Sequence, residues 1–284
     1  MGLLFAAMLL QAAAPTHAAA KPQRIVSLDL CADQLLIELV APERIAAVTH
    51  LAADPEVSAS WQKARRLPVT RGAAEDVLRQ RPDLVLAGPF GVAPTVGLLR
   101  RLKANVVVVP AASDLDGVRA AVRAVAAAVG EEVRGEAVIA DFNRRLADIA
   151  RSPPRAPPEA QAPAPTALVY QVGGDVSGAG SLADAALAAA GFRNKAAEYR
   201  LTRVGQVPLE LLAAAPPDLL VLSSAADEYR TVVSDNLRHP VLKRLRAEHA
   251  SVELPWRLWL CGTPHIADTI ARLAEIRRGL QAPR

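Results

Sequence analysis

The sequence predicts a two-lobed α/β protein with parallel sheets. Three observations lead to this prediction. Apolar runs of strand length alternate along the 284-residue chain with segments of helical periodicity, the pattern of parallel sheets covered by helices. The second half of the chain repeats motifs of the first half in the same order. The segment between the halves has the hydrophobic spacing of a long helix.

The elements of the first half occupy residues 21–113. Its apolar runs predict strands at residues 25–28, 45–48, 84–87 and 106–109. The periodic segments between them predict helices at residues 32–40, 73–81 and 94–103. We therefore expect an N-terminal α/β lobe.

Residues 114–151 form the predicted link between the lobes. Apolar residues at spacings of four, four and three share one face of a helix here: Val138, Phe142, Leu146 and Ile149. Gly130 is a candidate break that would divide the region into two helices. The part after this glycine would be about 30 Å long as a helix, enough to bridge two small lobes. The Pro-rich residues 152–165 then predict a stiff, exposed connector.

The C-terminal α/β lobe is expected to occupy residues 166–284. Its predicted strands are residues 167–171, 219–222 and 252–254, and its predicted helices are residues 182–190, 209–215, 237–247 and 266–280. A glycine-rich stretch, residues 173–180, precedes the first of these helices. It lacks the Gly-Lys-Ser/Thr ending of a phosphate-binding loop. We interpret it as a tight turn with Ser181 as the helix N-cap.

The repeat between the halves rests on three matches. Glu75 is followed after six residues by Pro-Asp-Leu and a strand, and so is Glu210. Residues 99–104 match residues 242–247, and each precedes a Val-containing strand that ends in proline. More weakly, Ala-Asp opens the first helix of each half. Because the three matches occur in the same order, we interpret the halves as duplicated lobes.

Composition limits the classes of function. The chain is 51% hydrophobic and 22% charged, which provides ample material for packed cores and excludes a chain disordered throughout. The formal charge is +4, but the arginine pairs are scattered along the chain. Nucleic-acid binding needs a concentrated basic patch with interleaved aromatic residues, so no nucleic-acid partner is expected.

The first 20 residues predict a signal peptide. An apolar run from residue 2 to residue 14 is followed by three alanines and then by Lys21. This length and the small residues at the cleavage site are typical of export signals. A lysine or arginine before the apolar run, which such signals usually carry, is missing. No cysteine follows the run, so the expected product is periplasmic and is not a lipoprotein.

The opening Arg24-Ile-Val-Ser-Leu28, the two Glu…Pro-Asp-Leu motifs and the linking helix resemble a known family. This family comprises the periplasmic solute-binding proteins of ABC importers for vitamin B12, haem and ferric siderophores. The resemblance covers nearly all of the chain after residue 20. It implies two Rossmann-like lobes with parallel sheets, joined by one long helix, with a ligand cleft between the lobes and only a small closing motion.

The resemblance also implies partners. We expect a monomer that captures a metal chelate, delivers it to an ABC permease in the inner membrane, and has no catalytic group, resident cofactor or metal site. In members that resemble the vitamin B12-binding protein, one glutamate on each lobe pairs with arginines of the permease. Glu75 and Glu210 occupy these motif positions. The alternative role of each glutamate is only to complement the dipole of its helix. Because the residue recurs in both halves, we favour docking to the permease.

Candidate ligand-binding residues follow from the rule that ligands bind outside the carboxyl ends of parallel strands. Aromatic ones would stack on a planar ligand, and arginines would bind peripheral carboxylates. Packing on the core is the alternative for each aromatic residue, and Trp259 has apolar neighbours on both sides. The candidates are Asp29, His50, Arg71 and Phe90 in the first lobe and Tyr199, Arg203, Trp256, Trp259 and His265 in the second.

Cys31 and Cys261 admit three states: a disulfide, ligation of a metal together with His265, or two unpaired thiols. An even number of cysteines permits a disulfide without requiring one, and no fourth metal ligand can be named. We therefore expect unpaired thiols. His265 has the further alternatives of an axial ligand to haem iron or cobalt and of a local helix cap.

A corrinoid is the expected ligand, with a ferric siderophore second and haem third. Few charges are predicted at the ends of the strands, and four glycines would let a broad planar ligand approach the backbone: Gly88, Gly173, Gly205 and Gly262. A sensing domain of the same fold and a periplasmic hydrolase are the alternatives from other classes. The sequence contains neither G-x-S-x-G nor H-E-x-x-H, which argues against the hydrolase.

Overall fold

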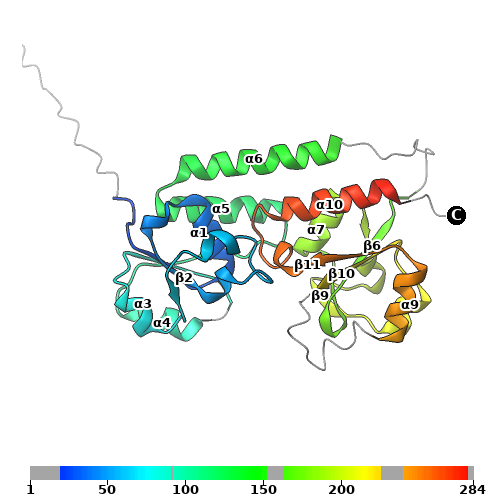
Figure 1. Ribbon diagram of the computed structural model, residues 1–284, viewed down its shortest axis with the longest axis horizontal. Helices are drawn as coiled ribbons and strands as arrows, with labels where there is room; N and C mark the ends of the chain where they lie inside the picture. Colours follow the sequence, from blue (N-terminus) through cyan, green and yellow to red (C-terminus); the bar gives the residue numbers. More distant parts are fainter. Residues whose placement is uncertain (1–19, 91, 152–162, 225–238, 281–284) are drawn as a thin grey trace, which may run out of the picture.

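The computed structural model describes residues 20–90, 92–151, 163–224 and 239–280. Two sheets flanked by helices lie next to each other, and α6 (Glu132–Arg151) runs along both (Figure 1). The predicted signal peptide, most of the predicted connector and the start of the helix predicted at residues 237–247 lie outside the described residues. Within the described ranges, no helix combines the length and the hydrophobicity that crossing a bilayer requires.

The first sheet is parallel throughout, as predicted. Among the described residues it has five strands in the order β3-β2-β1-β4-β5. β3 is two residues long, too short for hydrophobic periodicity to reveal it. The elements of this lobe are β1 (Ile25–Ser27), α1 (Leu30–Leu39), β2 (Ile45–Thr49), α2 (Trp61–Ala64), β3 (Val69–Thr70), α3 (Ala74–Arg79), β4 (Leu84–Ala87), α4 (Ala93–Arg101) and β5 (Val106–Val108).

Two packed helices link the sheets, α5 (Leu115–Val129) and α6. The break between them falls at Gly130, as predicted, because this residue ends α5 with a φ of 70° in the left-handed region. α5 contributes Val122 to the core of the first lobe and Val118 to the core of the second. In the same way α6 contributes Ile139 to the first core and Phe142 to the second. Each helix therefore packs on both lobes.

The second sheet is mixed, which differs from the all-parallel sheet expected. Its strands β11, β10 and β6 are parallel, but β7 runs antiparallel to both β6 and β9. Residues 171–174 alone connect β6 to β7, too few for the crossover that parallel pairing requires. The elements are β6 (Thr166–Tyr170), β7 (Asp175–Ser177), α7 (Leu182–Ala189), β8 (Arg193–Asn194), β9 (Val204–Gln206), α8 (Leu209–Ala214), β10 (Leu219–Ser224), α9 (Pro240–Glu248), β11 (Ser251–Pro255) and α10 (Ile266–Gly279).

The glycine-rich stretch is a tight turn, as predicted. Gly173 and Gly174 have φ values of 81° and 83° between β6 and β7, a conformation that suits glycine. Ser181 then caps α7, because its hydroxyl accepts a hydrogen bond from the backbone N–H of Asp184 at 3.1 Å. The local sequence therefore determines both the turn and the helix start.

The repeated Pro-Asp-Leu motif has the same structural role in both lobes. The Asp83 carboxylate, just before β4, accepts hydrogen bonds from the backbone N–H groups of Gln23 and Arg24 at 2.6 and 2.9 Å. The Asp218 carboxylate, just before β10, accepts hydrogen bonds from the backbone N–H and the hydroxyl of Thr166, both at 2.7 Å. In each lobe the aspartate thus holds the start of the neighbouring central strand, β1 or β6. The repeat in the sequence has a physical counterpart.

Candidate functional site

A cavity of about 220 Å³ lies where the two lobes meet, and we name it the cleft cavity. Its walls come from the ends of β1, β4 and β5 in the first lobe and from the segment after β11 in the second. This is the edge of the sheets at which ligands bind in parallel α/β folds. The lining residues are Asp29, Cys31, Leu35, Pro89, Phe90, Val109, Pro110, Ala111, Ala112, Ala121, Leu260 and Gly262.

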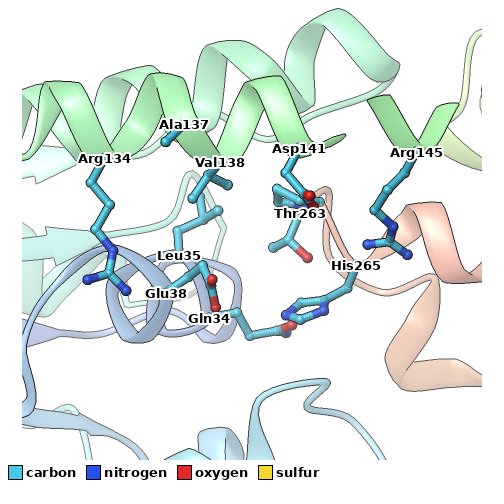
Figure 2. A pocket seen from close by; sticks show the side chains of 11 residues that line it. Gln34, Leu35, Glu38, Arg134, Ala137, Val138, Asp141, Arg145, Thr263 and His265 are labelled. Atoms are coloured by element: carbon cyan, nitrogen blue, oxygen red, sulfur yellow. The ribbon is translucent and has the colours of Figure 1, made fainter. Parts of the chain in front are cut away.

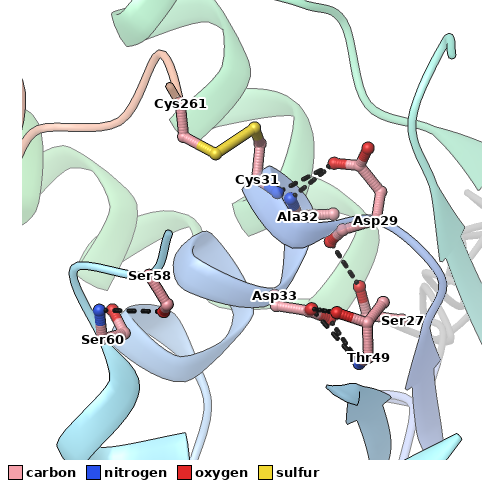
Figure 3. The surroundings of a disulfide bond; sticks show 9 residues. All are labelled: Ser27, Asp29, Cys31, Ala32, Asp33, Thr49, Ser58, Ser60 and Cys261. Atoms are coloured by element: carbon pink, nitrogen blue, oxygen red, sulfur yellow. Dashed lines mark hydrogen bonds between the residues drawn. A yellow bond between two sulfur atoms is a disulfide. The ribbon is translucent and has the colours of Figure 1, made fainter. Parts of the chain in front are cut away.

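Asp29 is the only ionisable group among the described residues that line the cleft cavity. It lies between β1 and α1 and is the N-cap of α1. Its Oδ1 accepts hydrogen bonds from the backbone N–H groups of Cys31 and Ala32, both at 3.0 Å (Figure 3). These bonds and the positive end of the helix dipole stabilise the carboxylate. The remaining wall is apolar or uncharged.

Three of the four glycines expected to admit a ligand serve packing of the protein. The space that a Cβ would occupy at Gly88, Gly205 and Gly262 is filled by other side chains of the chain. The filling residues are Asp29, Leu201 and Ala112, respectively. Gly262 nevertheless lines the cleft cavity, whereas Gly88 and Gly205 do not.

Cys31 and Cys261 form a disulfide at the wall of the cleft cavity (Figure 3). Their Cα atoms are 5.1 Å apart, within the usual range for such a bond. The expectation of unpaired thiols is wrong, because the fold brings the first turn of α1 against the segment after β11. Metal ligation by the two thiols is wrong for the same reason. The described residues contain no group of three or more His, Cys, Asp or Glu side chains arranged to hold a metal ion.

Two further contacts join the lobes near this bond. The Ser60 hydroxyl lies 3.5 Å from Nε2 of His265. The Arg257 guanidinium donates a hydrogen bond from Nη1 to the backbone carbonyl of Pro55 at 3.2 Å. Together with α5 and α6, these contacts hold the two lobes against each other at the base of the cleft.

Asp33 on α1 accepts hydrogen bonds from β2 inside the first lobe. Its fully buried carboxylate accepts hydrogen bonds from the backbone N–H and the hydroxyl of Thr49, the latter at 2.5 Å (Figure 3). Burial raises the pKa of Asp33 to about 7, and hydrogen bonds from Ser27 and Thr49 oppose this increase. Because α1 also carries Cys31, this contact helps to position the wall of the cleft cavity.

The structure brings some predicted ligand-binding residues to the cleft. Asp29 and Phe90 line the cleft cavity, and the Phe90 side chain is 77% exposed, so its ring is accessible to a ligand. His50 and Arg71 are exposed and directly follow β2 and β3 at the same edge of the first sheet. Trp256 directly follows β11 in the second lobe. These last three lie at strand ends without lining the cleft cavity.

Tyr199 and Arg203 lie at the opposite edge of the second sheet. The Tyr199 hydroxyl donates a hydrogen bond at 3.4 Å to the carbonyl of Ala215, which precedes the amino end of β10. Burial raises the pKa of the Tyr199 phenol above its ordinary value. Arg203 precedes β9, which runs in the same direction as β6. The antiparallel β7, absent from the predicted topology, is the reason for this placement.

Trp259 and His265 also lie outside the cleft cavity. Trp259 packs against the core of the second lobe, the alternative that its apolar neighbours suggested. His265 lines a second cavity beside α6. The cleft residues that sequence reasoning missed include Pro110, Ala111 and Ala112, although they follow β5 and the strand-end rule indicates them. Leu260 is placed at the cavity by the disulfide at the neighbouring Cys261, whereas Gly262 is one of the four glycines that the sequence predicts beside the ligand.

Glu75 and Glu210 occupy equivalent places in the two lobes. Each is exposed and is the second residue of a six-residue helix, α3 or α8. Each helix leads into a central strand, β4 or β10, so its amino end lies at the carboxyl edge of its sheet. Both carboxylates therefore lie on the side of the lobes that carries the cleft.

Comparisons with known proteins agree with this architecture. The periplasmic binding protein family matches residues 25–249. A cobalamin-binding protein of Halobacterium salinarum is 26% identical over 215 residues, covering 75% of this chain and 57% of that protein. This chain thus spans little more than half the length of that relative.

Two solved structures illustrate the range of similar folds. The periplasmic heme-binding protein RhuT from Roseiflexus sp. RS-1, in its apo form, has a TM-score of 0.72 at 25% identity, covering 91% of this chain and 98% of that one. The periplasmic vitamin B12 binding protein BtuF of Vibrio cholerae has a TM-score of 0.65 at 18% identity, again covering 91% and 98%. The second likeness is one of fold alone.

Proposed function

The chain belongs to the periplasmic binding protein family, and we propose that it is the substrate-binding component of an ABC importer for a metal chelate, with a corrinoid such as cobalamin as its ligand. In this proposal the protein captures the chelate in the periplasm and delivers it to a permease without catalysing a reaction. The wall of the cleft cavity carries the proposal. It has one carboxylate, already bonded to the start of α1, and otherwise apolar or uncharged residues.

This wall suits a broad ligand of low charge. A ferric catecholate siderophore carries several negative charges and needs a group of cationic side chains in the cleft. Of the two arginines predicted for that role, Arg71 lies at a strand end and Arg203 lies at the opposite edge of its sheet. Asp29 would in addition repel an anionic ligand. The similarity to a cobalamin-binding protein of Halobacterium salinarum supports the same choice.

Haem is the second candidate, favoured by the likeness to RhuT from Roseiflexus. Haem iron takes an axial ligand such as Tyr or His from the protein. Neither Tyr199 nor His265, the two predicted for this role, lines the cleft cavity. His50, exposed at the end of β2, does not line the cleft cavity either. Cyanocobalamin brings its own axial ligands and therefore needs none of these side chains.

The cleft cavity holds only the edge of such a ligand. Its volume of about 220 Å³ is smaller than a corrin ring with its side chains, so most of the ligand would lie between the lobes. Phe90, exposed beside the cavity, and Trp256, at the end of β11, are the aromatic residues proposed to stack on it.

Glu75 and Glu210 are proposed to pair with arginines of the permease. Carboxylate–arginine pairs give orientation as well as affinity, and one pair on each lobe would align the cleft with the transport path. A sensing domain of the same fold would bind its ligand in the same cleft but would not need both carboxylates. A charge reversal of these two residues therefore separates import from sensing.

Calorimetric titration with cyanocobalamin, hemin and the ferric catecholate ferric enterobactin tests the ligand. We expect one site for cyanocobalamin at micromolar or tighter affinity. Phe90→Ala and Trp256→Ala should each weaken it about fivefold or more, the loss of about 1 kcal/mol of stacking. Trp61→Ala is the matched control, because Trp61 on α2 stacks with Arg65 away from the cleft cavity. Binding of hemin or ferric enterobactin without cyanocobalamin would overturn the corrinoid, and binding of none would count against a chelate importer.

A further inference from the structure

A second cavity, of about 360 Å³, lies between α1, α6 and residues 263–265 (Figure 2). The chain after β11 passes from one cavity to the other. Leu260 and Gly262 line the cleft cavity, whereas Thr263 and His265 line the second cavity. Between them, Cys261 is bonded to Cys31. The second cavity is therefore the one beneath α6 and is distinct from the proposed chelate site.

Gln34 on α1 is the most informative residue of the second cavity. Its side chain is buried, with 1% of the residue exposed. Neither its Nε2 donor nor its Oε1 acceptor has a hydrogen-bond partner among the described residues. A buried amide without hydrogen-bond partners lowers the stability of the fold, whereas leucine or methionine would fill the same volume without this cost. Partners for this amide would therefore come from outside the described residues.

The neighbouring polar groups suit an uncharged ligand. Figure 2 shows the His265 ring and the Gln34 amide pointing toward one another. Burial lowers the pKa of His265, so the neutral imidazole has one donor and one acceptor at neutral pH. Thr263, at 2% exposed, adds a hydroxyl to the same wall.

The charged side chains that line the second cavity pair with residues outside its lining or lie in solvent. Glu38 pairs with Lys63 at 3.0 Å. Asp141 pairs with Arg144, and Arg145 pairs with Asp268. Arg134 is exposed. A net charge on the ligand would have no buried counter-charge here, which favours a neutral molecule.

We propose that the second cavity is a binding site for a small neutral carboxamide, whose amide pairs with Gln34 by donating one hydrogen bond to Oε1 and accepting one from Nε2. A primary amide presents a donor and an acceptor on one edge and so matches the two unsatisfied atoms together. A carboxylate would satisfy only Nε2, and an ammonium group only Oε1. This site is additional to the chelate cleft.

The side-chain amide resonances of Gln34 in ¹⁵N-labelled protein report on this site directly. Gln34→Met identifies these resonances by their loss. On titration with acetamide we expect a saturable shift of the Gln34 resonances. N,N-dimethylacetamide accepts hydrogen bonds but cannot donate them, so it should bind about tenfold more weakly or not at all.

Two variants on α6 complete the test. Ala137 is exposed and lines the second cavity, so Ala137→Phe should fill it and abolish the acetamide response without disturbing either core. Ala140→Phe is the matched control, since Ala140 is exposed on the same helix and does not line the cavity. Absence of a saturable shift, equal responses to the two amides, or a response that survives Ala137→Phe would each overturn the proposal. The result is independent of whether cyanocobalamin binds in the cleft.

Discussion

Cys31 and Cys261, which are 230 residues apart in the sequence, form a disulfide that joins the first turn of α1 in one lobe to the segment after β11 in the other. Because Cys31 also lines the cleft cavity, the bond fixes the spacing of the lobes where the chelate is proposed to bind. The Ser60 hydroxyl, 3.5 Å from Nε2 of His265, is a further contact between the two lobes. Any opening of the cleft therefore has to pivot about its base.

Removing this bond should destabilise the protein. The double variant Cys31→Ser/Cys261→Ser should lower the free energy of unfolding by about 2–5 kcal/mol, because the unfolded chain loses a constraint that closes a very long loop. Urea denaturation followed by circular dichroism measures the loss. Wild-type protein in excess reductant is the control and should match the variant. Equal stability of oxidised wild type and variant would mean that the bond is not formed.

Asp33 should make stability depend on pH. Its folded-state pKa of about 7 lies above the ordinary value of 3.8, so the folded protein favours the protonated carboxyl. This stabilisation is complete below about pH 4 and is lost as the pH rises through about 7. Between pH 5 and pH 8 the wild type should therefore lose about 2–3 kcal/mol relative to Asp33→Asn, which does not titrate. Urea denaturation of both proteins at the two pH values gives this difference, in which other titrating groups cancel. A constant difference would show that Asp33 is ionised throughout.

Asp83 and Asp218 should contribute to stability in parallel. Asp83→Ala and Asp218→Ala each remove a carboxylate that accepts two hydrogen bonds at the start of a neighbouring strand. We expect each to lower the free energy of unfolding by about 1–2 kcal/mol. Asp116→Ala is the control, because the Asp116 side chain is 95% exposed and forms only a surface ion pair with Arg119. Losses no larger than that of the control would refute the common role of the motif.

Reversing the charge of Glu75 and Glu210 should separate transport from binding. The double variant Glu75→Lys/Glu210→Lys should abolish uptake by cells, because lysines would repel the arginines proposed on the permease. Ligand affinity in solution should change by less than about tenfold, or about 1.4 kcal/mol. Glu132→Lys/Glu136→Lys, a double reversal on the exposed side of α6, should leave uptake intact. Normal uptake by the first variant would rule out docking through these residues.

The sequence by itself determined the elements that depend on local pattern. The predicted strand at residues 84–87 coincides with β4, the break of the linking region falls at Gly130, and Ser181 caps α7. Each of these follows from hydrophobic periodicity, backbone conformation or side-chain capping within a few residues. The repeat also followed from the sequence, although only the contacts of Asp83 and Asp218 explained why its aspartate recurs.

The tertiary structure alone decided the direction of β7, the pairing of Cys31 with Cys261 and the burial of the Gln34 amide without a partner among the described residues. Strand direction placed Arg203 at the edge of its sheet away from the cleft. Local pattern states which face of an element is apolar, but not which distant segment covers that face. Contacts between segments 230 residues apart arise from the packing of whole lobes, so the walls of both cavities exist only once the chain is folded.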